Sequence, residues 1–318
     1  MDKQHFELGF LLNVTNWDGE IITLKSRDEI LEKIDIFKKL NISWVIIGGF
    51  QLEEALGFNI HEGAEFVGKL LKENELKVAS HHCILPTYAS LDGSQEKVRE
   101  TMKKTVDFCS LLNTDNVVFH PGEIDGAHRS GQDNVCRFEA EEKKYGIDKI
   151  LTTVSDNLIV MGKYAANFGL NICVENLGRF TPLGSLEHLP KLVAGADLPN
   201  VGYCLDTGHA HAFGESIEQW IDIMGDKLFT THIHDNRGRL AGDKSSSLIL
   251  SSKSVDEHEF PGFGTINWMD VINKFRAIDF KHPICFETSG WIGYKGLESY
   301  EKGISWWRTC ETLSQARD

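Results

Sequence analysis

Histidines and carboxylates gather in short polar motifs, each of which follows an apolar run. In chain order the motifs read SHHC, FHPG, VENLG, LDTGHAH, HIHDN and FETSG, and a further segment reads DEHEFPGFG. Imidazole and carboxylate groups together suit divalent ions such as zinc, manganese, cobalt or iron. They are also costly to bury unless they are paired or bind a metal. The residues that could do this chemistry are His81 or His82, His120, Glu175, Asp206, His209, His232, His234, Asp256, His258 and Glu287.

The apolar runs before these motifs alternate with amphipathic segments. Strands are expected over residues 6–13, 43–50, 76–84, 116–122, 170–178, 201–209, 228–236 and 282–290, and helices over 28–40, 61–74, 95–112, 147–168, 186–194, 217–224, 267–277 and 297–314. This alternation predicts right-handed βαβ units and a parallel sheet. Eight units without a linker favour an α/β fold, a (β/α)8 TIM barrel, with residues 1–318 as one domain. An open doubly wound sheet is the alternative, but no GxGxxG motif follows the first run.

A barrel would bring the motifs together, because the C-terminal ends of its strands surround one pocket. Two long loops are expected on this face, at about 123–146 and 237–265, after the fourth and seventh strands. The second loop carries Asp256 and His258. The active site is therefore expected at the C-terminal ends of the strands.

Three cysteines precede the carboxylates of the motifs by two residues: Cys173, Cys204 and Cys285. Residues two apart share one face of a strand, so these side chains should point into the barrel beneath the site. We interpret them as small packing residues that lie too deep to bind the same metal.

The composition excludes several classes of protein. The formal net charge is −14, from 47 acidic and 33 basic residues, which argues against broad binding to nucleic acid or to an anionic membrane. No apolar run reaches the roughly 18–20 residues that span a bilayer. The seven cysteines lie mostly in apolar runs, which is typical of reduced thiols in a cytoplasmic protein. A homo-oligomer is neither predicted nor excluded.

The motifs, in this order, resemble the xylose isomerase-like TIM-barrel superfamily of sugar phosphate isomerases and epimerases, which is related to endonuclease IV. The resemblance covers nearly the whole chain and includes the longer forms CLDTGHAHAFG, HIHDNRG and DEHEFPGFGTINW. In the isomerases and epimerases a Glu–Asp–His–Glu set holds one divalent ion, which implies Glu175, Asp206, His232 and Glu287 here. In endonuclease IV the set extends to three zinc ions. The additional metal ligands implied by that resemblance are His81 or His82, His120, His209, Asp256 and His258.

The leading hypothesis is a divalent-metal-dependent sugar isomerase or epimerase. The ion (manganese, cobalt or zinc) would polarise a carbonyl group, and a carboxylate would remove the neighbouring proton to give a metal-stabilised enediolate. Glu175 and Glu287 would serve as base and acid, with His209 as a further catalytic group. The remaining candidates, for binding the sugar or sugar derivative, are His120, Asn176, Arg237 and His258. A ketosugar lyase or dehydratase would use the same enolate and remains an alternative.

A second hypothesis is an endonuclease IV-like phosphodiesterase that cleaves DNA at abasic sites. Its metal cluster would activate water and stabilise the leaving oxygen. The acidic balance of the chain weighs against a nucleic-acid partner. A third hypothesis, a metal-binding barrel without catalysis, is disfavoured by the two candidate acid–base glutamates beside a histidine-rich pocket.

Overall fold

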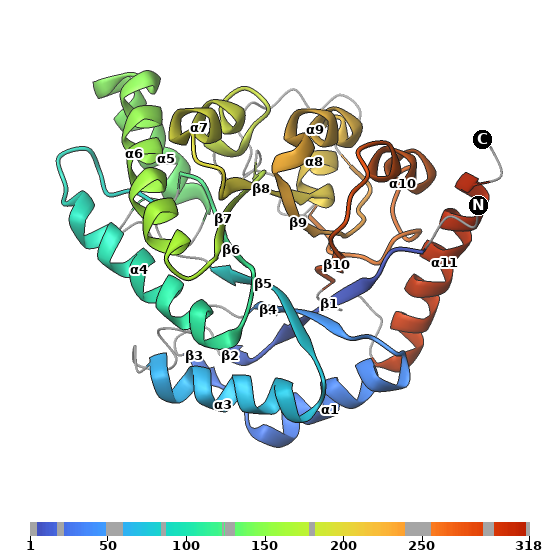
Figure 1. Cartoon of the computed structure of the whole chain (residues 1–318). Helices are drawn as coiled ribbons and strands as arrows, with labels where there is room; N and C mark the ends of the chain where they lie inside the picture. The colour runs from blue at the N-terminus through green and yellow to red at the C-terminus, as the bar shows by residue number, and fades with distance from the viewer. Residues whose placement is uncertain are drawn as a thin grey trace.

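A barrel of parallel strands forms the centre of the molecule, with helices around it (Figure 1). The computed structural model describes residues 5–17, 22–48, 60–83, 87–122, 124, 131–177, 182–238, 256–288 and 296–315. The barrel strands are β1 (Leu8–Asn13), β4 (Trp44–Gly48), β5 (Lys77–Cys83), β6 (Asn116–Phe119), β7 (Asn171–Glu175), β8 (Val201–Asp206), β9 (Leu228–His232) and β10 (Ile284–Phe286). Their order in the sheet is β10-β1-β4-β5-β6-β7-β8-β9.

The two edges of this sheet meet through hydrogen bonds just beyond β9. The backbone N–H of Ile233 donates to the carbonyl oxygen of Cys285 at 2.7 Å, and the N–H of Glu287 donates to the carbonyl oxygen of Ile233 at 3.1 Å. These bonds join β9 to β10, so the predicted (β/α)8 TIM barrel is confirmed. Closure of the sheet also satisfies the backbone groups that an open edge would expose.

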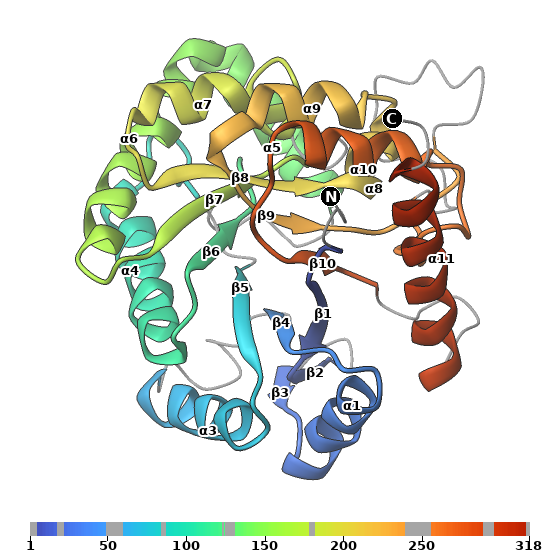
Figure 2. The same cartoon turned by 45° about the vertical axis from the view of Figure 1, so that its right-hand side comes forward.

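Helices cover the outside of the barrel (Figure 2). The expected helices are all present, as α1 (Arg27–Lys39), α3 (Ile60–Glu73), α4 (Gln95–Leu112), α6 (Ile147–Ala166), α7 (Leu189–Ala196), α9 (Ile217–Met224), α10 (Trp268–Ala277) and α11 (Leu297–Gln315). The first shows why these segments are helical. Ser26 and Glu29 form a capping box at its start, and Ile30, Ile34 and Phe37 bury one stripe against the core.

The segment 123–146 was expected to be a loop, and this expectation was wrong for most of its length. Helix α5 (Gly131–Tyr145) occupies it. Of the helix residues whose burial the structure describes, only Phe138 is fully buried. A helix with so little apolar surface lacks the hydrophobic periodicity from which it could have been predicted.

The expected strand at 201–209 is too long. Strand β8 ends at Asp206, and a short helix, α8 (Thr207–Phe213), begins at once. The Asp206 carboxylate accepts a hydrogen bond from the backbone N–H of His209 at 2.6 Å and so caps this helix. His209 therefore projects from a helix and not from a strand.

Of two other segments, one was not predicted and the other lies partly outside the described residues. A short antiparallel hairpin, β2 (Thr15–Trp17) and β3 (Ile22–Leu24), follows β1 and was not predicted. The expected loop at 237–265 is described at 237–238 and 256–265, and the rest of it lies outside the described residues.

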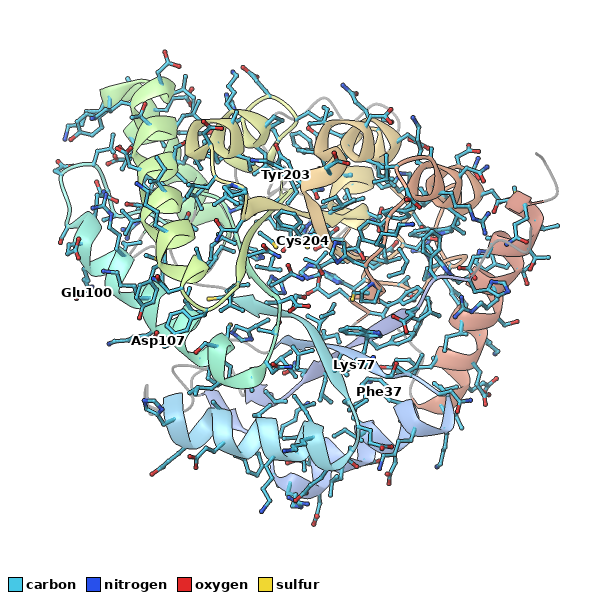
Figure 3. The ribbon with its side chains drawn as sticks, in the orientation of Figure 1. Phe37, Lys77, Glu100, Asp107, Tyr203 and Cys204 are labelled. Carbon is cyan, nitrogen blue, oxygen red and sulfur yellow. The ribbon has the colours of Figure 1, made fainter. Side chains whose placement is uncertain are left out.

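The interior of the barrel contains the cysteines expected there. Cys173 and Cys204 pack with Val118 in a small buried cluster, and Cys285 packs with Ile46 and Ala79 in another. Cys204 lies near the centre of the ring of strands (Figure 3). All seven cysteines are free of disulfides. Within the described ranges, no helix combines the length and apolarity needed to cross a membrane.

A buried carboxylate, that of Asp235, holds the segment after β9 onto the barrel. Its oxygens accept hydrogen bonds from the backbone N–H groups of Asn236, Gly262 and Ile266 at 2.9, 2.9 and 3.2 Å. They also accept one from the indole N–H of Trp268 at 2.8 Å. Because Asp256 and His258 lie at the start of the same segment, this carboxylate fixes the place from which both project.

Replacing this acceptor should destabilise the fold. Asp235→Ala leaves these buried donors without a partner, so we expect the free energy of unfolding to fall by about 3 kcal/mol or more in urea denaturation. Asp222→Ala is the control, because Asp222 pairs with Lys274 on the surface and should cost less than about 1 kcal/mol. Equal losses in the two variants would contradict the anchoring role.

Candidate metal centre

Four acidic and imidazole side chains meet at the C-terminal ends of the strands, and we call them the central cluster. Glu175, Asp206 and His232 end β7, β8 and β9, and Glu287 directly follows β10. All four are buried, and one ligand atom from each lies within 4.8 Å of the others. The Nδ1 atom of His232 is 3.2 Å from Glu175 Oε1 and 3.3 Å from Glu287 Oε2. The structure thus brings together the four residues selected as metal ligands.

Several polar atoms of Glu175, His232 and Glu287 lack the hydrogen bonds that buried groups normally make. Within the described part of the chain, no hydrogen bond reaches either carboxylate oxygen of Glu175, Oε2 of Glu287 or either ring nitrogen of His232. Their ion-pair partners there are histidines. Buried carboxylates without a strong cation are costly. A divalent ion would satisfy these atoms, so the donor set fits one.

His82, and not His81, joins this cluster. Its Nδ1 lies 3.0 Å from Glu287 Oε1 and its Nε2 lies 3.3 Å from Glu175 Oε2. His81 faces the opposite side of β5, where its Nδ1 contacts the carbonyl oxygen of Ile47 and its ring packs against Phe108 of α4. Adjacent residues of a strand point to opposite faces, which decides between the two.

Carboxylates control the charge of His82. Burial alone would lower the pKa of its imidazole, but the carboxylates of Glu287 and Glu175 outweigh burial and raise this pKa to about 10. The effect on the acids is reciprocal. Burial would raise the pKa of Glu175, yet His232 and His82 hold it well below its ordinary value. The buried carboxylates therefore favour a positive charge beside them.

His120 completes this side of the site. Its Nε2 lies 2.8 Å from Nε2 of His82 and 3.5 Å from Oε2 of Glu175. These three residues form a further group whose ligand atoms lie within 4.8 Å of one another. The structure thus places His120 beside the central cluster.

A second group, the outer cluster, consists of His209, His234, Asp256 and His258. Oδ2 of Asp256 lies 3.5 Å from Nε2 of His209 and 3.3 Å from Nε2 of His258. Burial would raise the pKa of Asp256, but these two histidines hold it well below its ordinary value. His209 also joins the two clusters, because its Nδ1 lies 3.3 Å from Oε1 of Glu175.

Two of the expected substrate-binding residues have other partners. The amide of Asn176 exchanges two hydrogen bonds of 2.7 Å with the backbone of Asp206 and so holds the end of β8 against β7. The side chain of Arg237 is 66% exposed and forms an ion pair with Glu257. His258 is better placed for substrate, because its side chain is 24% exposed beside the buried clusters.

His234 was a candidate from its residue type and place, but the sequence assigned it no specific role, and it is fully buried in the site. The sequence signal that could have identified it is its position as the second histidine of HIHDN. It follows His232 by two residues and so lies on the same side of the chain.

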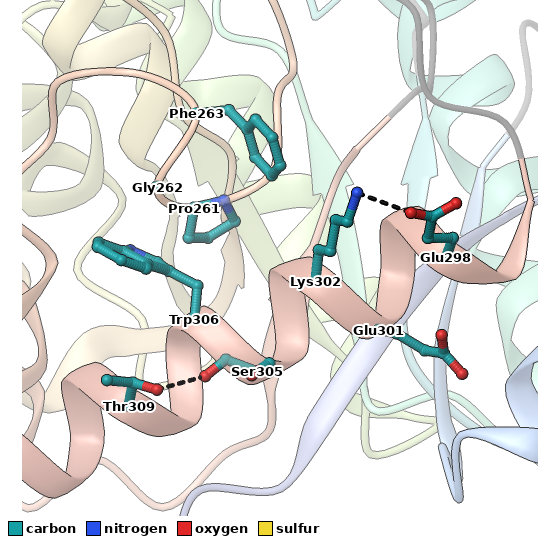
Figure 4. Close-up of a pocket in the computed structure, with 9 residues that line it drawn as sticks. All are labelled: Pro261, Gly262, Phe263, Glu298, Glu301, Lys302, Ser305, Trp306 and Thr309. Carbon is teal, nitrogen blue, oxygen red and sulfur yellow. Dashed lines mark hydrogen bonds and ion pairs between the residues drawn. The ribbon is translucent and has the colours of Figure 1, made fainter.

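A cavity lies away from these clusters, between α11 and the segment after β9 (Figure 4). It measures about 490 Å³ and is lined by Pro261, Gly262, Phe263, Glu298, Glu301, Lys302, Ser305, Trp306 and Thr309. Lys302 pairs with Glu298 at 2.7 Å, and Trp306 is 48% exposed. The cavity contains no histidine and none of the residues selected from the sequence.

Comparison with known proteins gives distant relatives. The chain is 24% identical over 217 residues to the uncharacterized protein y4fM of Sinorhizobium fredii, covering 68% of this chain and 58% of that protein. It is 27% identical over 148 residues to inosose isomerase of Bacillus subtilis, covering 46% and 47%. It is 27% identical over 238 residues to a probable endonuclease 4 of Halothermothrix orenii, covering 70% and 75%. The chain thus spans about half the length of the first two.

Solved structures share the fold over almost the full chain. A D-tagatose 3-epimerase-like protein superposes with a TM-score of 0.66 at 18% identity, covering 97% of this chain and 98% of that chain. The IOLI protein with a bound zinc atom superposes with a TM-score of 0.64 at 16% identity, covering 97% and 98%.

A family model described as a xylose isomerase-like TIM barrel matches residues 47–310, which include every residue of the two clusters. The chain belongs to the xylose isomerase-like TIM-barrel family.

Proposed function

We propose that this protein is a divalent-metal-dependent isomerase or epimerase that acts on a sugar or sugar derivative. One observation carries the proposal: each of two glutamates has one oxygen at His232 and the other at His82. For Glu175 these are Oε1, at 3.2 Å, and Oε2, at 3.3 Å. For Glu287 they are Oε2, at 3.3 Å, and Oε1, at 3.0 Å. Each carboxylate can thus serve as a metal ligand and as a proton carrier.

The central cluster would hold the ion through Glu175, Asp206, His232 and Glu287. When bound, a manganese, cobalt or zinc ion supplies Lewis acidity that polarises a carbonyl oxygen of the substrate. The oxygens of Glu175 and Glu287 that face His82 are left for proton transfer. One carboxylate removes the proton next to the carbonyl group and the other returns it, which interconverts two epimers or two isomers.

His82 connects the two acid–base groups. Because its two ring nitrogens contact Glu287 and Glu175, it can hold a proton between them. His209 contacts both Glu175 and Asp206 and would orient them. His120 and His258, at the less buried side of the clusters, would bind sugar oxygens. A ketosugar lyase or dehydratase would use the same residues and differ only in the group that leaves.

The names of the similar proteins support this class of enzyme. Inosose isomerase and a D-tagatose 3-epimerase-like protein are named for isomerisation and epimerisation, and the IOLI structure contains zinc. A small-molecule substrate also agrees with the net charge of −14.

The second candidate is a phosphodiesterase of the endonuclease IV kind. It is favoured by the outer cluster and by the group of His82, His120 and Glu175, since both could hold further ions beside the central cluster. Several ions together can stabilise the attacking and leaving oxygens of a phosphate displacement. The similarity to a probable endonuclease 4 agrees with this alternative.

Metal removal tests the dependence on the ion. Protein stripped with a chelator should lose activity on a panel of ketoses and inososes, and manganese, cobalt or zinc should restore it. An ion present at 100 times its Kd should also raise the free energy of unfolding by about 2.7 kcal/mol. Full turnover by protein verified as metal-free would refute the proposal.

Substitution of the glutamates tests the proton transfer. Glu175→Gln and Glu287→Gln should each slow the incorporation of solvent deuterium next to the carbonyl group by about 10²–10⁴-fold, because an amide cannot carry the proton. The matched control is Glu259→Gln, outside both clusters, which should leave the rate unchanged. Wild-type exchange rates in both cluster variants would remove these residues from the mechanism.

Metal content and DNA cleavage distinguish the two candidate functions. The isomerase assignment predicts one tightly bound ion per chain by elemental analysis and no cleavage of abasic-site DNA. Two or three tightly bound ions, together with incision at the abasic site, would favour the phosphodiesterase and overturn the leading assignment.

A further inference from the structure

We propose that His234 is a positioning residue that holds the Asp206 carboxylate in the orientation needed to bind the metal. The inference rests on the proposed function, since it assumes that the central cluster binds an ion. His234 lies outside that cluster and would act only through Asp206.

The contact between these residues is direct and buried. Nε2 of His234 lies 3.0 Å from Oδ2 of Asp206 and 3.0 Å from its Oδ1, and both side chains are fully buried. Oδ1 already accepts a hydrogen bond from the backbone N–H of His209, in the first turn of α8. The imidazole is thus the side-chain donor that reaches Oδ2. A carboxylate only accepts hydrogen bonds here, so Nε2 must carry the proton.

The backbone around His234 is built to hold this ring. Its N–H donates to the hydroxyl of Thr207 at 3.1 Å, and the same hydroxyl donates to the His234 carbonyl oxygen at 3.0 Å. Gly208 leaves room for the imidazole, because a Cβ at that position would lie 1.8 Å from the ring. The chain after β9 and the start of α8 are therefore shaped around one side chain.

His234 also connects the two clusters. Its ring stacks on that of His258, with centroids 4.0 Å apart and an angle of 12° between the planes. Its Nε2 lies 3.8 Å from Oδ1 of Asp256. A ring held on one face by His258 and at its edge by Asp206 has little freedom to rotate. The hydrogen bond from this fixed ring also restricts the orientation of the Asp206 carboxylate.

Without this donor, Oδ2 of Asp206 would be a buried anionic oxygen able to turn away from the central cluster. Groups that hydrogen-bond to a metal-binding carboxylate fix its direction, and their loss costs about 10–100-fold in metal affinity. We therefore expect His234 to control the Kd of the ion without contacting it.

The test compares two polar replacements by calorimetric titration of metal-free protein with Mn²⁺. The amide nitrogen of His234→Gln reaches approximately where Nε2 lies, whereas the shorter side chain of His234→Asn does not. We expect a Kd near the wild-type value for His234→Gln and a Kd about 10–100-fold weaker for His234→Asn. His211→Asn, on the same helix as His209 but in neither cluster, is the control and should bind as the wild type does.

Each outcome has a distinct meaning. If His234→Gln and His234→Asn bind Mn²⁺ equally, the hydrogen bond to Asp206 has no positioning role and the inference is wrong. The two metal-free variants can also be compared by urea unfolding. If they differ in free energy of unfolding by as much as they differ in free energy of Mn²⁺ binding, the effect is structural and the inference is also wrong. If the wild-type protein itself binds no Mn²⁺, the proposed metal dependence fails instead.

Discussion

The concentration of buried carboxylates at one end of the barrel is the constraint that the site must satisfy. Glu175 and Glu287 lie within 3.3 Å of His82 and His232. Asp206 and Asp256 lie within 3.8 Å of His209 and His234. Carboxylates in such a setting need positive charge nearby. Protonated histidines can supply part of it, and a divalent ion supplies it in the form that polarises a substrate carbonyl.

The surrounding structure keeps these charges in place by using polar groups that are not themselves reactive. Asn176 ties the end of β8 to β7, and Asp235 anchors the segment that carries the outer cluster. Gly208 gives the space in which His234 reaches Asp206. Each of these contacts sets the direction of a side chain, and direction decides whether a group of charged residues can bind an ion.

The fold was largely predictable because strands and helices alternate with clear periodicity. Helix α5 was missed because its only fully buried described residue is Phe138, and α8 was missed because a cap at Asp206, not a hydrophobic pattern, begins it. The ring of ligand-type residues also followed from the barrel. The choice between His81 and His82 did not, because it depends on the register of β5, and the role of His234 depends on a contact across two elements.

The most direct test of the account is anomalous diffraction from crystals grown with Mn²⁺, recorded on both sides of the manganese absorption edge. The account predicts one dominant peak within bonding distance of Glu175, Asp206, His232 and Glu287. A structure with manganese bound elsewhere and no peak among these four side chains would contradict it.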